Sequence, residues 1–584
     1  MIPGGLIFNQ CHGRTRNHAG YERPTLKHDI SRRALLPVAT GIGWGAVGLF
    51  AGSAPAQANP QSLTDTPPTV LTPGVHRVDI NLTIRGDLMV PSGTTIEIAE
   101  GRTLTLLGSF MAPLAHVFTG TGTVDLNRSR MVEAHPEWWG AAPGDSRRDS
   151  LAALKACLAA HPVMRLLAAD YFISATFAVE RSFCRIIGSG FRGTEPGQGT
   201  RLIMTGGRAD VLRVGPASRP KTVNDFLQNV DVRGIALART VAPDTSGEAQ
   251  PAGLRAQFLL FGRIDDVSAA EHAVGFVARG LVRTTFTNCV AFRSMRGKQD
   301  NQYWRGFLLD GSVDIGLAGG NASLSLIECN ASIGGDPKIG DGVGLLLDGA
   351  FADSFILGFE TTGIATGIRV DGRADALAAR GRNGHVNLHL TMPIIDQCGT
   401  IGIEIRNTST HAMIDITEPY VAVAPSATAA LRFDRMRGAA TLTGGQCVGN
   451  MDMAAGGHAA GLEALDSHGL QTTGLKILEH SRPVVVTRCN GLSLRLLIAN
   501  PSSRPGGDAI SVSNCTAGTI APLISGQDGA FATGVRFVGG SVQMHVDASG
   551  IMPAALDGNG PRVMNGDRPF SLPSREAYIT VDGI

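Results

Sequence analysis

Glu328, Asp353 and Glu360 are the residues of this chain whose type and spacing best suit acid–base chemistry. Asp353 and Glu360 lie between two copies of one motif, GLLLDG at 344–349 and GIRVDG at 367–372. If these copies are strands on adjacent coils of a parallel solenoid, equivalent side chains lie about 4.8 Å apart. Glycoside hydrolases pair carboxylates at about 5–5.5 Å or about 6.5–9.5 Å, and mutual repulsion keeps one of them protonated. We therefore predict Glu360, with Glu328 or Asp353, as the acid–base pair.

Four further residues near these acids are assigned to substrate binding. Tyr303 and Trp304 directly precede a predicted strand, where an aromatic ring would offer a flat apolar surface to a sugar. Asp336 and Arg382 are polar residues of the neighbouring connections. Core packing remains the alternative for Trp304, and a solvated turn remains the alternative for Asp336.

Three other aspartates, Asp310, Asp348 and Asp371, end predicted strands and each precedes a glycine. Asp-Gly pairs are typical of turns because both residues tolerate turn geometry. We interpret these three residues as structural.

A uronate lyase would use different groups, namely a base and cations that hold the uronate carboxylate. The candidates are Lys338, Arg369, Arg382, His385 and Tyr420, which are scattered along the chain. Only this reaction would call for calcium, and no CxxC or Cys/His cluster indicates zinc. For a hydrolase we predict neither a cofactor nor a metal site.

A repeated strand must position all these residues. The motif, an apolar tetrad after Gly or Ala, recurs with steps of 31, 38, 23, 35 and 28 residues through its first six copies. In solenoids such insertions become loops on one face. The copies are GFVARG at 275–280, GFLLDG at 306–311, GLLLDG at 344–349, GIRVDG at 367–372, GIEIRN at 402–407, ALRFDR at 430–435 and GVRFVG at 534–539.

A second column of polar residues follows the other apolar strand of each repeat. We expect these residues to share one turn position, at which Glu328, Glu360 and Glu418 are acids. The column comprises Asn288, Glu328, Glu360, Gln397, Glu418, Gln446, Glu479 and Asn514.

Composition agrees with a long β-solenoid. The chain has 584 residues, of which 75 are Gly, while aromatic residues make up only 5%, so aliphatic side chains must form the core. The formal net charge is +1, which gives no electrostatic argument for a nucleic-acid or anionic membrane partner.

Most of the nine cysteines recur at multiples of about 23 residues, which favours stacked, unpaired core thiols over disulfides.

The first 58 residues have the pattern of a twin-arginine signal. SRRALL at 31–36 is followed by a weakly apolar run at 37–53 and by Ala56-Gln57-Ala58. We predict cleavage after Ala58, export to the periplasm or the medium, and no membrane attachment afterwards. A short membrane anchor is the alternative.

Residues 59–135 read as a linker and a small β-module, and residues 136–584 as the solenoid. Within residues 136–584 we predict a helix over 149–160, where apolar residues recur at helical spacing. Asp149 is the expected N-cap, and His161-Pro162 ends the helix.

The order of PEWWGA at 136–141, GDSRRDSLAALKACL at 144–158, RLLAADYFIS at 165–174 and RIIGSGFRGTEPGQGTRLIM at 185–204 resembles the entry region of pectate-lyase-superfamily right-handed β-helices. This group includes tailspike-like polysaccharide depolymerases. The resemblance implies that helix 149–160 caps the solenoid, that the partner is a polysaccharide or oligosaccharide, and that a homotrimer is one expected assembly.

The sequence thus predicts an all-β protein, a right-handed parallel β-helix with a small N-terminal β-module and a capping helix. The leading functional hypothesis is an exported glycoside hydrolase. The alternatives are a uronate polysaccharide lyase and a non-catalytic exopolysaccharide-binding protein.

Overall fold

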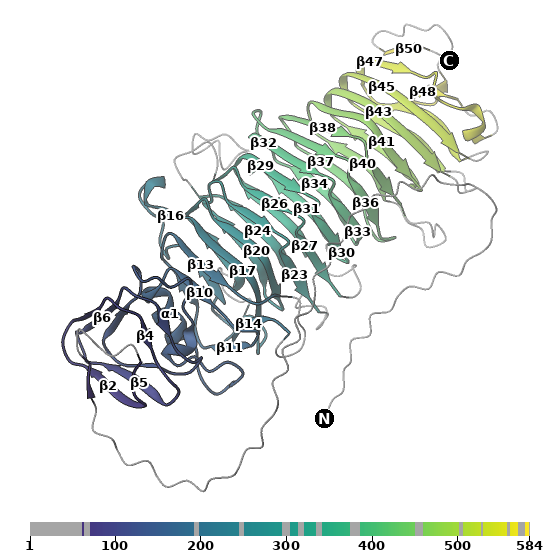
Figure 1. Cartoon of the computed structure of the whole chain (residues 1–584). Helices are drawn as coiled ribbons and strands as arrows, with labels where there is room; N and C mark the ends of the chain where they lie inside the picture. Colours follow the sequence, from purple (N-terminus) through teal and green to yellow (C-terminus); the bar gives the residue numbers. More distant parts are fainter. Residues whose placement is uncertain are drawn as a thin grey trace, which may run out of the picture. The chain divides into compact units, whose positions relative to one another are not determined.

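The computed structural model describes residues 61–63, 70–191, 198–244, 250–294, 304–313, 320–334, 342–373, 386–449, 459–500, 506–526, 530–557, 561–569 and 579–582. These residues belong to one compact unit, Ala58–Ile584. Figure 1 shows its strands stacked along one axis as long parallel sheets. The prediction of an all-β parallel β-helix is confirmed. The predicted signal sequence lies outside the described residues.

The small N-terminal module repeats the solenoid pattern with short coils. Three parallel sheets surround a core that includes Ile96 and Leu104. The strands are β1 (Gln61–Ser62), β2 (Gly74–Val78), β5 (Thr94–Ile98) and β8 (Phe118–Gly120); β3 (Leu82–Ile84), β6 (Thr103–Leu106) and β9 (Thr123–Asp125); and β4 (Leu88–Met89) and β7 (Phe110–Met111). The chain visits the sheets in turn, so the two coils β2 to β4 and β5 to β7 each contribute one strand to every sheet.

A helical connection joins this module to the main β-helix. It consists of the 3-10 helix η1 (Pro136–Trp139) and the α-helix α1 (Leu151–Ala160), which contacts η1 and strands β9, β10 and β12. Asp149 accepts a hydrogen bond from the Leu151 N–H at 2.9 Å, although Ser150 occupies the N-cap position. Leu154 and Leu158 are buried in the core, so the predicted capping helix is confirmed.

The recurring motif forms one sheet of the main β-helix, which we call the repeat sheet. Val343 pairs with Thr366 and Leu345 with Ile368, which confirms the 23-residue step between these two copies. Among the described residues its strands are β12 (Phe177–Val179), β15 (Leu212–Val214), β18 (Ala252–Gln257), β21 (Val274–Arg279), β24 (Arg305–Gly311), β28 (Val343–Gly349), β31 (Thr366–Asp371), β34 (Ile401–Arg406), β37 (Ala429–Asp434), β40 (Ala460–Leu465), β42 (Arg482–Thr487), β44 (Gly506–Ser513), β46 (Phe531–Val538), β48 (Val563–Asn565) and β49 (Arg568–Pro569).

The glycine that opens most copies of the motif has a packing role. A Cβ added at Gly344 would lie 2.5 Å from Thr361 Cγ2, and one added at Gly367 would lie 2.5 Å from Ile395 Cγ2. Only Gly allows the coil to close this tightly against the neighbouring strand.

The remaining strands of the main β-helix form what we call the bent sheet. Each coil turns sharply within it, at residues with positive φ such as Asn288, Glu328 and Gly358. Its described strands are β10 (Val163–Arg165), β11 (Asp170–Ile173), β13 (Cys184–Ile187), β14 (Thr200–Met204), β17 (Val230–Arg239), β20 (Arg263–Ala270), β22 (Thr285–Thr287), β23 (Val290–Arg293), β25 (Asn321–Ala322), β26 (Ser325–Ile327), β27 (Asn330–Ile333), β29 (Phe351–Leu357), β30 (Glu360–Thr362), β32 (Val386–Thr391), β33 (Ile394–Cys398), β35 (Met413–Thr417), β36 (Tyr420–Val423), β38 (Ala439–Thr443), β39 (Gln446–Val448), β41 (Leu470–Leu478), β43 (Asn490–Asn500), β45 (Thr516–Gly526), β47 (Val542–Asp547) and β50 (Ile579–Asp582).

Short elements complete the structure: the two-stranded sheet of β16 (Leu227–Gln228) and β19 (Leu259–Leu260), and the 3-10 helices η2 (Val223–Asp225) and η4 (Pro553–Ala555).

The interior is a long apolar core in which aliphatic side chains predominate, with buried Phe and Cys side chains among them. The eight cysteines within the described residues are all buried and unpaired, as predicted. Cys11 lies outside these residues. None of the helices in the described part of the chain is both long and apolar enough to cross a membrane.

Candidate active site

Three aspartates stack on adjacent coils at one margin of the repeat sheet. Asp310 on β24 pairs in register with Asp348 on β28, which pairs with Asp371 on β31. Neighbouring strands are about 4.8 Å apart, so the three carboxyl groups form a continuous row along the axis. We call this row the aspartate ladder.

The turn interpretation of these residues is correct only in part. Asp310 accepts hydrogen bonds from the Ser312 N–H and hydroxyl, and Asp371 accepts one from the Arg373 N–H at 3.2 Å. Asp348 pairs instead with the side chain of Arg373. The turn interpretation thus holds for Asp310 and Asp371, and all three side chains are mostly buried.

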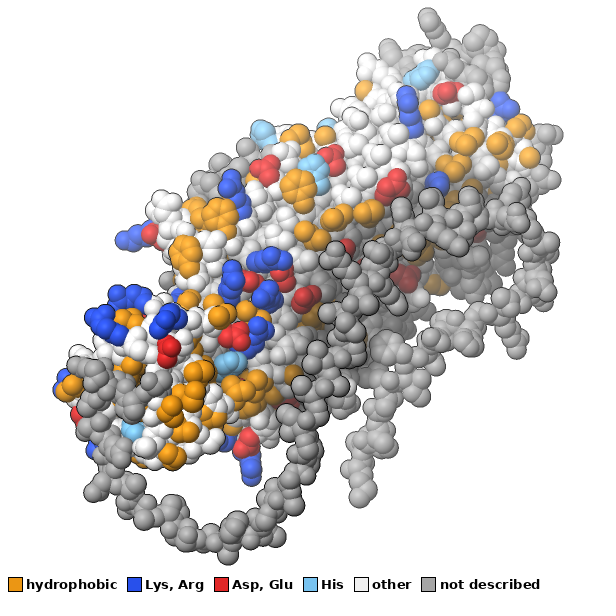
Figure 2. Space-filling model, viewed as in Figure 1, with side chains coloured by type: hydrophobic (Ala, Val, Ile, Leu, Met, Phe, Trp, Pro, Cys, Tyr) orange, Lys and Arg blue, Asp and Glu red, His pale blue; other side chains and the backbone are white. Residues whose placement is uncertain are grey.

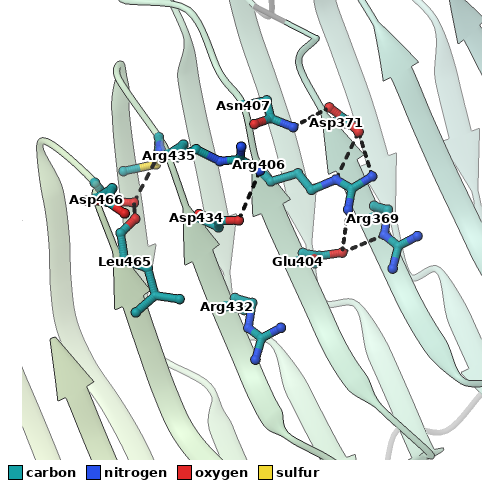
Figure 3. A network of polar contacts seen from close by, with 12 residues as sticks. Arg369, Asp371, Glu404, Arg406, Asn407, Arg432, Asp434, Arg435, Leu465 and Asp466 are labelled. Carbon is teal, nitrogen blue, oxygen red and sulfur yellow. Dashed lines mark hydrogen bonds and ion pairs between the residues drawn. The ribbon is translucent and has the colours of Figure 1, made fainter. Parts of the chain in front are cut away.

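Each ladder carboxylate has its own arginine. Arg279 Nε lies 3.3 Å from Asp310, the Arg373 guanidinium contacts both oxygens of Asp348, and Arg406 Nη2 lies 2.8 Å from Asp371. Figure 3 shows the C-terminal part of this network, in which Arg406 lies between Asp371 and Glu404. The ladder therefore carries buried charge that is largely compensated.

The pKa values of two neighbouring ladder carboxyl groups, those of Asp348 and Asp371, are shifted in opposite directions. Burial, together with the charges of Asp310 and Asp371, outweighs Arg373 and raises the pKa of Asp348 to about 6. Burial would also raise the pKa of Asp371, but the hydrogen bond from Asn407 and the charge of Arg406 outweigh it and bring that pKa below its usual value. Neighbouring carboxyl groups with diverging pKa values are the usual basis for assigning an acid and its ionised partner.

A groove of about 560 Å³ runs beside the ladder on the outside of the repeat sheet. Asp310 and Asp348 line it, together with Arg255, Arg279, Arg305 and the apolar side chain of Leu346. A carboxyl group with a raised pKa, a second carboxylate and an apolar wall thus line one open surface. Such a set of groups suits cleavage of a bond whose leaving oxygen needs a proton, once Asp348 is free of Arg373.

The predicted acids Glu328 and Glu360 lie on the bent sheet instead. Glu360 pairs in register with Asn330, and Glu328 is level with Gly358, so the two glutamates occupy different columns. The expectation that they are equivalent residues of adjacent coils was wrong. The positive-φ bend that Glu328 occupies in one coil is occupied by Gly358 in the next, so Glu360 lies two residues beyond the bend.

Asp353 does not join either glutamate. It lies near the start of β29, whereas Glu360 follows the bend beyond the end of that strand. Asn387 Nδ2 donates a hydrogen bond to Asp353 at 2.9 Å. All three predicted acids are exposed, and the structure does not bring them into one site.

The predicted sugar platform is also corrected. Trp304 is only 1% exposed and belongs to the main core, because it packs close to Gly306 in the following strand. Its ring faces are not available to a ligand. Tyr303, Asp336 and Arg382 lie outside the described residues.

The lyase candidates divide between the two sheets. Arg369 lies on the repeat sheet and is bound by Glu404, while Tyr420 lies on the bent sheet. Lys338, Arg382 and His385 lie outside the described residues. Within the described part of the chain, no group of three or more His, Cys, Asp or Glu side chains could hold a metal ion.

The bent sheet has a different surface, which we call the apolar patch. Neighbouring coils place Phe355, Leu357, Met392, Ile394 and Tyr420 on its outside, each between 37% and 51% exposed. The Phe355 ring stacks on His389 with centroids 4.8 Å apart. Figure 2 shows hydrophobic side chains gathered over this part of the molecule.

Comparison with known proteins adds information about the fold. No protein-family model matches the chain, and no curated protein matches its sequence. The structure is similar to a mutant tailspike protein of E. coli bacteriophage HK620 in complex with a pentasaccharide, with a TM-score of 0.54 and 12% identity, covering 73% of this chain and 76% of that chain. A complex of that protein with a hexasaccharide gives 0.52 and 10% identity, covering 73% and 75%. The predicted tailspike-like β-helix is confirmed as a fold.

Proposed function

We propose that this protein hydrolyses glycosidic bonds in a polysaccharide at the aspartate ladder. The observation that carries the proposal is Asp348, whose carboxyl pKa is raised to about 6 beside Asp310 in an open groove. A carboxylic acid with such a pKa is a competent proton donor near neutral pH. The oligosaccharide complexes of the HK620 tailspike support a carbohydrate ligand on this fold.

In the proposed reaction Asp348 donates its proton to the glycosidic oxygen as the bond to the anomeric carbon breaks. Asp310, one coil away in the same groove, attacks that carbon and forms a glycosyl ester. Water, deprotonated by Asp348, then hydrolyses the ester and restores both carboxyl groups. The strand spacing of about 4.8 Å is closer to the separation of retaining glycosidases than to that of inverting ones.

Asp371 supports this reaction without contacting the substrate. Arg406 and Asn407 keep it ionised, and its negative charge helps to keep the proton on Asp348. It is therefore a positioning residue rather than a catalytic one.

The proposal is tested by incubating the chain from residue 59 onwards with a panel of neutral and acidic polysaccharides. New reducing ends are expected, with the anomeric configuration retained in the first product seen by NMR. An unsaturated product that absorbs ultraviolet light would instead establish a lyase. Binding without any cleavage would establish a non-catalytic glycan-binding protein.

Export and assembly are proposed on the sequence alone. A twin-arginine signal ending at Ala58 predicts that the mature protein starts at Asn59, which N-terminal sequencing of exported protein would check. Light scattering of the purified protein would distinguish a monomer from the trimer that the resemblance implies.

A further inference from the structure

One residue contacts two members of the aspartate ladder. The guanidinium of Arg373 contacts both carboxylate oxygens of Asp348 on the preceding coil. The backbone N–H of the same residue donates to Asp371 at 3.2 Å. Arg373 therefore contacts both Asp348, the proposed acid, and Asp371, the next carboxylate of the ladder.

The backbone of Arg373 forms a bend after strand β31. Its φ is 44°, in the left-handed region that also occurs at other coil bends of this β-helix, such as Asn407 and Arg435. The Arg373 side chain is 51% exposed, whereas that of Asp348 is 15% exposed. The guanidinium thus covers the carboxyl group from the solvent side.

This contact conflicts with catalysis. A guanidinium bound to both oxygens favours the ionised carboxylate and leaves no oxygen free to donate a proton. Asp348 can protonate a glycosidic oxygen only after Arg373 has moved away. An anionic group that takes up the guanidinium fork would favour this movement, because a new charge-assisted pair replaces the one that Arg373 loses at Asp348.

We propose that Arg373 is a receptor for an anionic group of the substrate, and that binding of this group releases Asp348 for catalysis. This inference rests on the proposed function and narrows its substrate to an acidic polysaccharide. The negatively charged group takes the place of the Asp348 carboxylate in the guanidinium fork, so the charge of Arg373 remains paired. A neutral polysaccharide carries no anionic group that could replace the Asp348 carboxylate at Arg373.

The groove itself fits an acidic chain. Three further arginines, Arg255, Arg279 and Arg305, line it beside Asp310 and Asp348. Arg255 and Arg279 are paired with Asp210 and Asp310, which fixes their guanidinium groups at the wall. Arg373 and the guanidinium groups of the groove wall would thus lie near the anionic groups of a polymer in the groove, with the charges of Arg255 and Arg279 already shared with Asp210 and Asp310.

The test follows the titration of Asp348 directly, by NMR of the selectively labelled carboxyl carbon, so it does not require turnover. The probes are sodium glucuronate, glucose 6-sulfate and glucose. In the wild-type protein glucuronate or the sulfate should raise the titration midpoint by about one pH unit, and glucose should not. The difference between the two anions distinguishes a carboxylate from a sulfate receptor.

The matched variants are Arg373→Gly and Arg435→Gly. Both residues have a positive φ, 44° and 52°, which Gly adopts readily, so both variants should fold. Arg435 pairs with Asp434 outside the ladder. Arg373→Gly should show the raised midpoint without ligand and no response to anions, whereas Arg435→Gly should behave like the wild type.

A midpoint that ignores both anions, or that is unchanged in Arg373→Gly, would overturn the role of Arg373. So would cleavage of neutral polysaccharides only. If no polysaccharide is cleaved by any variant but the titration responds as described, the hydrolase proposal fails and the anion receptor remains.

Discussion

The aspartate ladder on the repeat sheet and the three predicted acids on the bent sheet differ in register, burial and ion pairing. Asp310, Asp348 and Asp371 are aligned, mostly buried and matched with arginines. Glu328, Asp353 and Glu360 are exposed and lie in separate columns. Register and burial, rather than the number of carboxylates, make an acid–base site.

The backbone explains the difference. Glu328 and Asp353 have φ values of 53° and 48°, so they occupy bends where the side chain leaves the sheet and faces solvent. The ladder aspartates end extended strands whose neighbours are stacked in register. Water screens charges on the bends, while the ladder aspartates interact through a medium that screens them less.

The largest expected difference between the two sheets is in catalysis. Asp348→Asn or Asp310→Asn should lower kcat/KM on a cleaved polysaccharide by about 100-fold to 10,000-fold, the usual contribution of an acid–base residue. Glu360→Gln, on the bent sheet, should remain within about twofold of the wild type by the same assay of reducing ends. Full loss in Glu360→Gln with an active Asp348→Asn would reverse the assignment.

The second difference is in stability. Because the pKa of Asp348 is raised from 3.8 to about 6, its charge destabilises the folded protein increasingly from about pH 4 to pH 6 and fully above that. Asp348→Asn should therefore be more stable relative to the wild type at pH 8 than at pH 4, by up to about 3 kcal/mol. Urea unfolding at both pH values measures this.

Asp434→Asn is the control for that experiment, because Asp434 occupies the same column but has Arg406 and Leu465 as its neighbours. An equal pH dependence in both variants would mean that the ladder does not shift the pKa of Asp348.

A smaller effect is expected from Asp371→Asn. Removing this charge lowers the pKa of Asp348, which must be protonated for catalysis, so the alkaline limb of the kcat/KM profile should move to lower pH by about one unit. A change in KM alone, with the limb unmoved, would assign Asp371 to substrate binding.

The smallest catalytic effect should come from the apolar patch. Phe355→Ser removes a half-exposed ring that stacks on His389. We expect kcat/KM to remain within about twofold and binding of a hydrophobic dye to decrease, because exposed apolar area is lost. A large fall in kcat/KM would extend the active surface to the bent sheet.

Much of the fold could be predicted from the sequence. The spaced motifs became the strands of the repeat sheet, the helix near residues 149–160 formed, and the described cysteines are unpaired core residues. Each of these depends on local pattern: apolar alternation selects the buried face, and Gly allows the close approach of neighbouring coils.

The candidate site could be predicted less well, although the sequence contains the pattern that would have indicated it. Asp310, Asp348 and Asp371 occupy the same place in three successive motif copies, so their stacking followed from the repeat that was already recognised. Each of the three aspartates precedes Gly, and an Asp-Gly pair is typical of a turn. This local preference gave no indication that the three charges interact along one row. Trp304 was misassigned because a lone aromatic residue at a strand start does not show which way it points.

The sequence by itself determined that this chain forms a parallel β-helix, because a short motif repeated many times can bury its apolar side only by stacking. Only the tertiary structure decided which acids meet. Bends and insertions of different length set the register between coils, and that register aligns Asp310, Asp348 and Asp371 but separates Glu328 from Glu360. Burial and neighbouring charge then raise the pKa of Asp348, and neither can be read from its place in the chain.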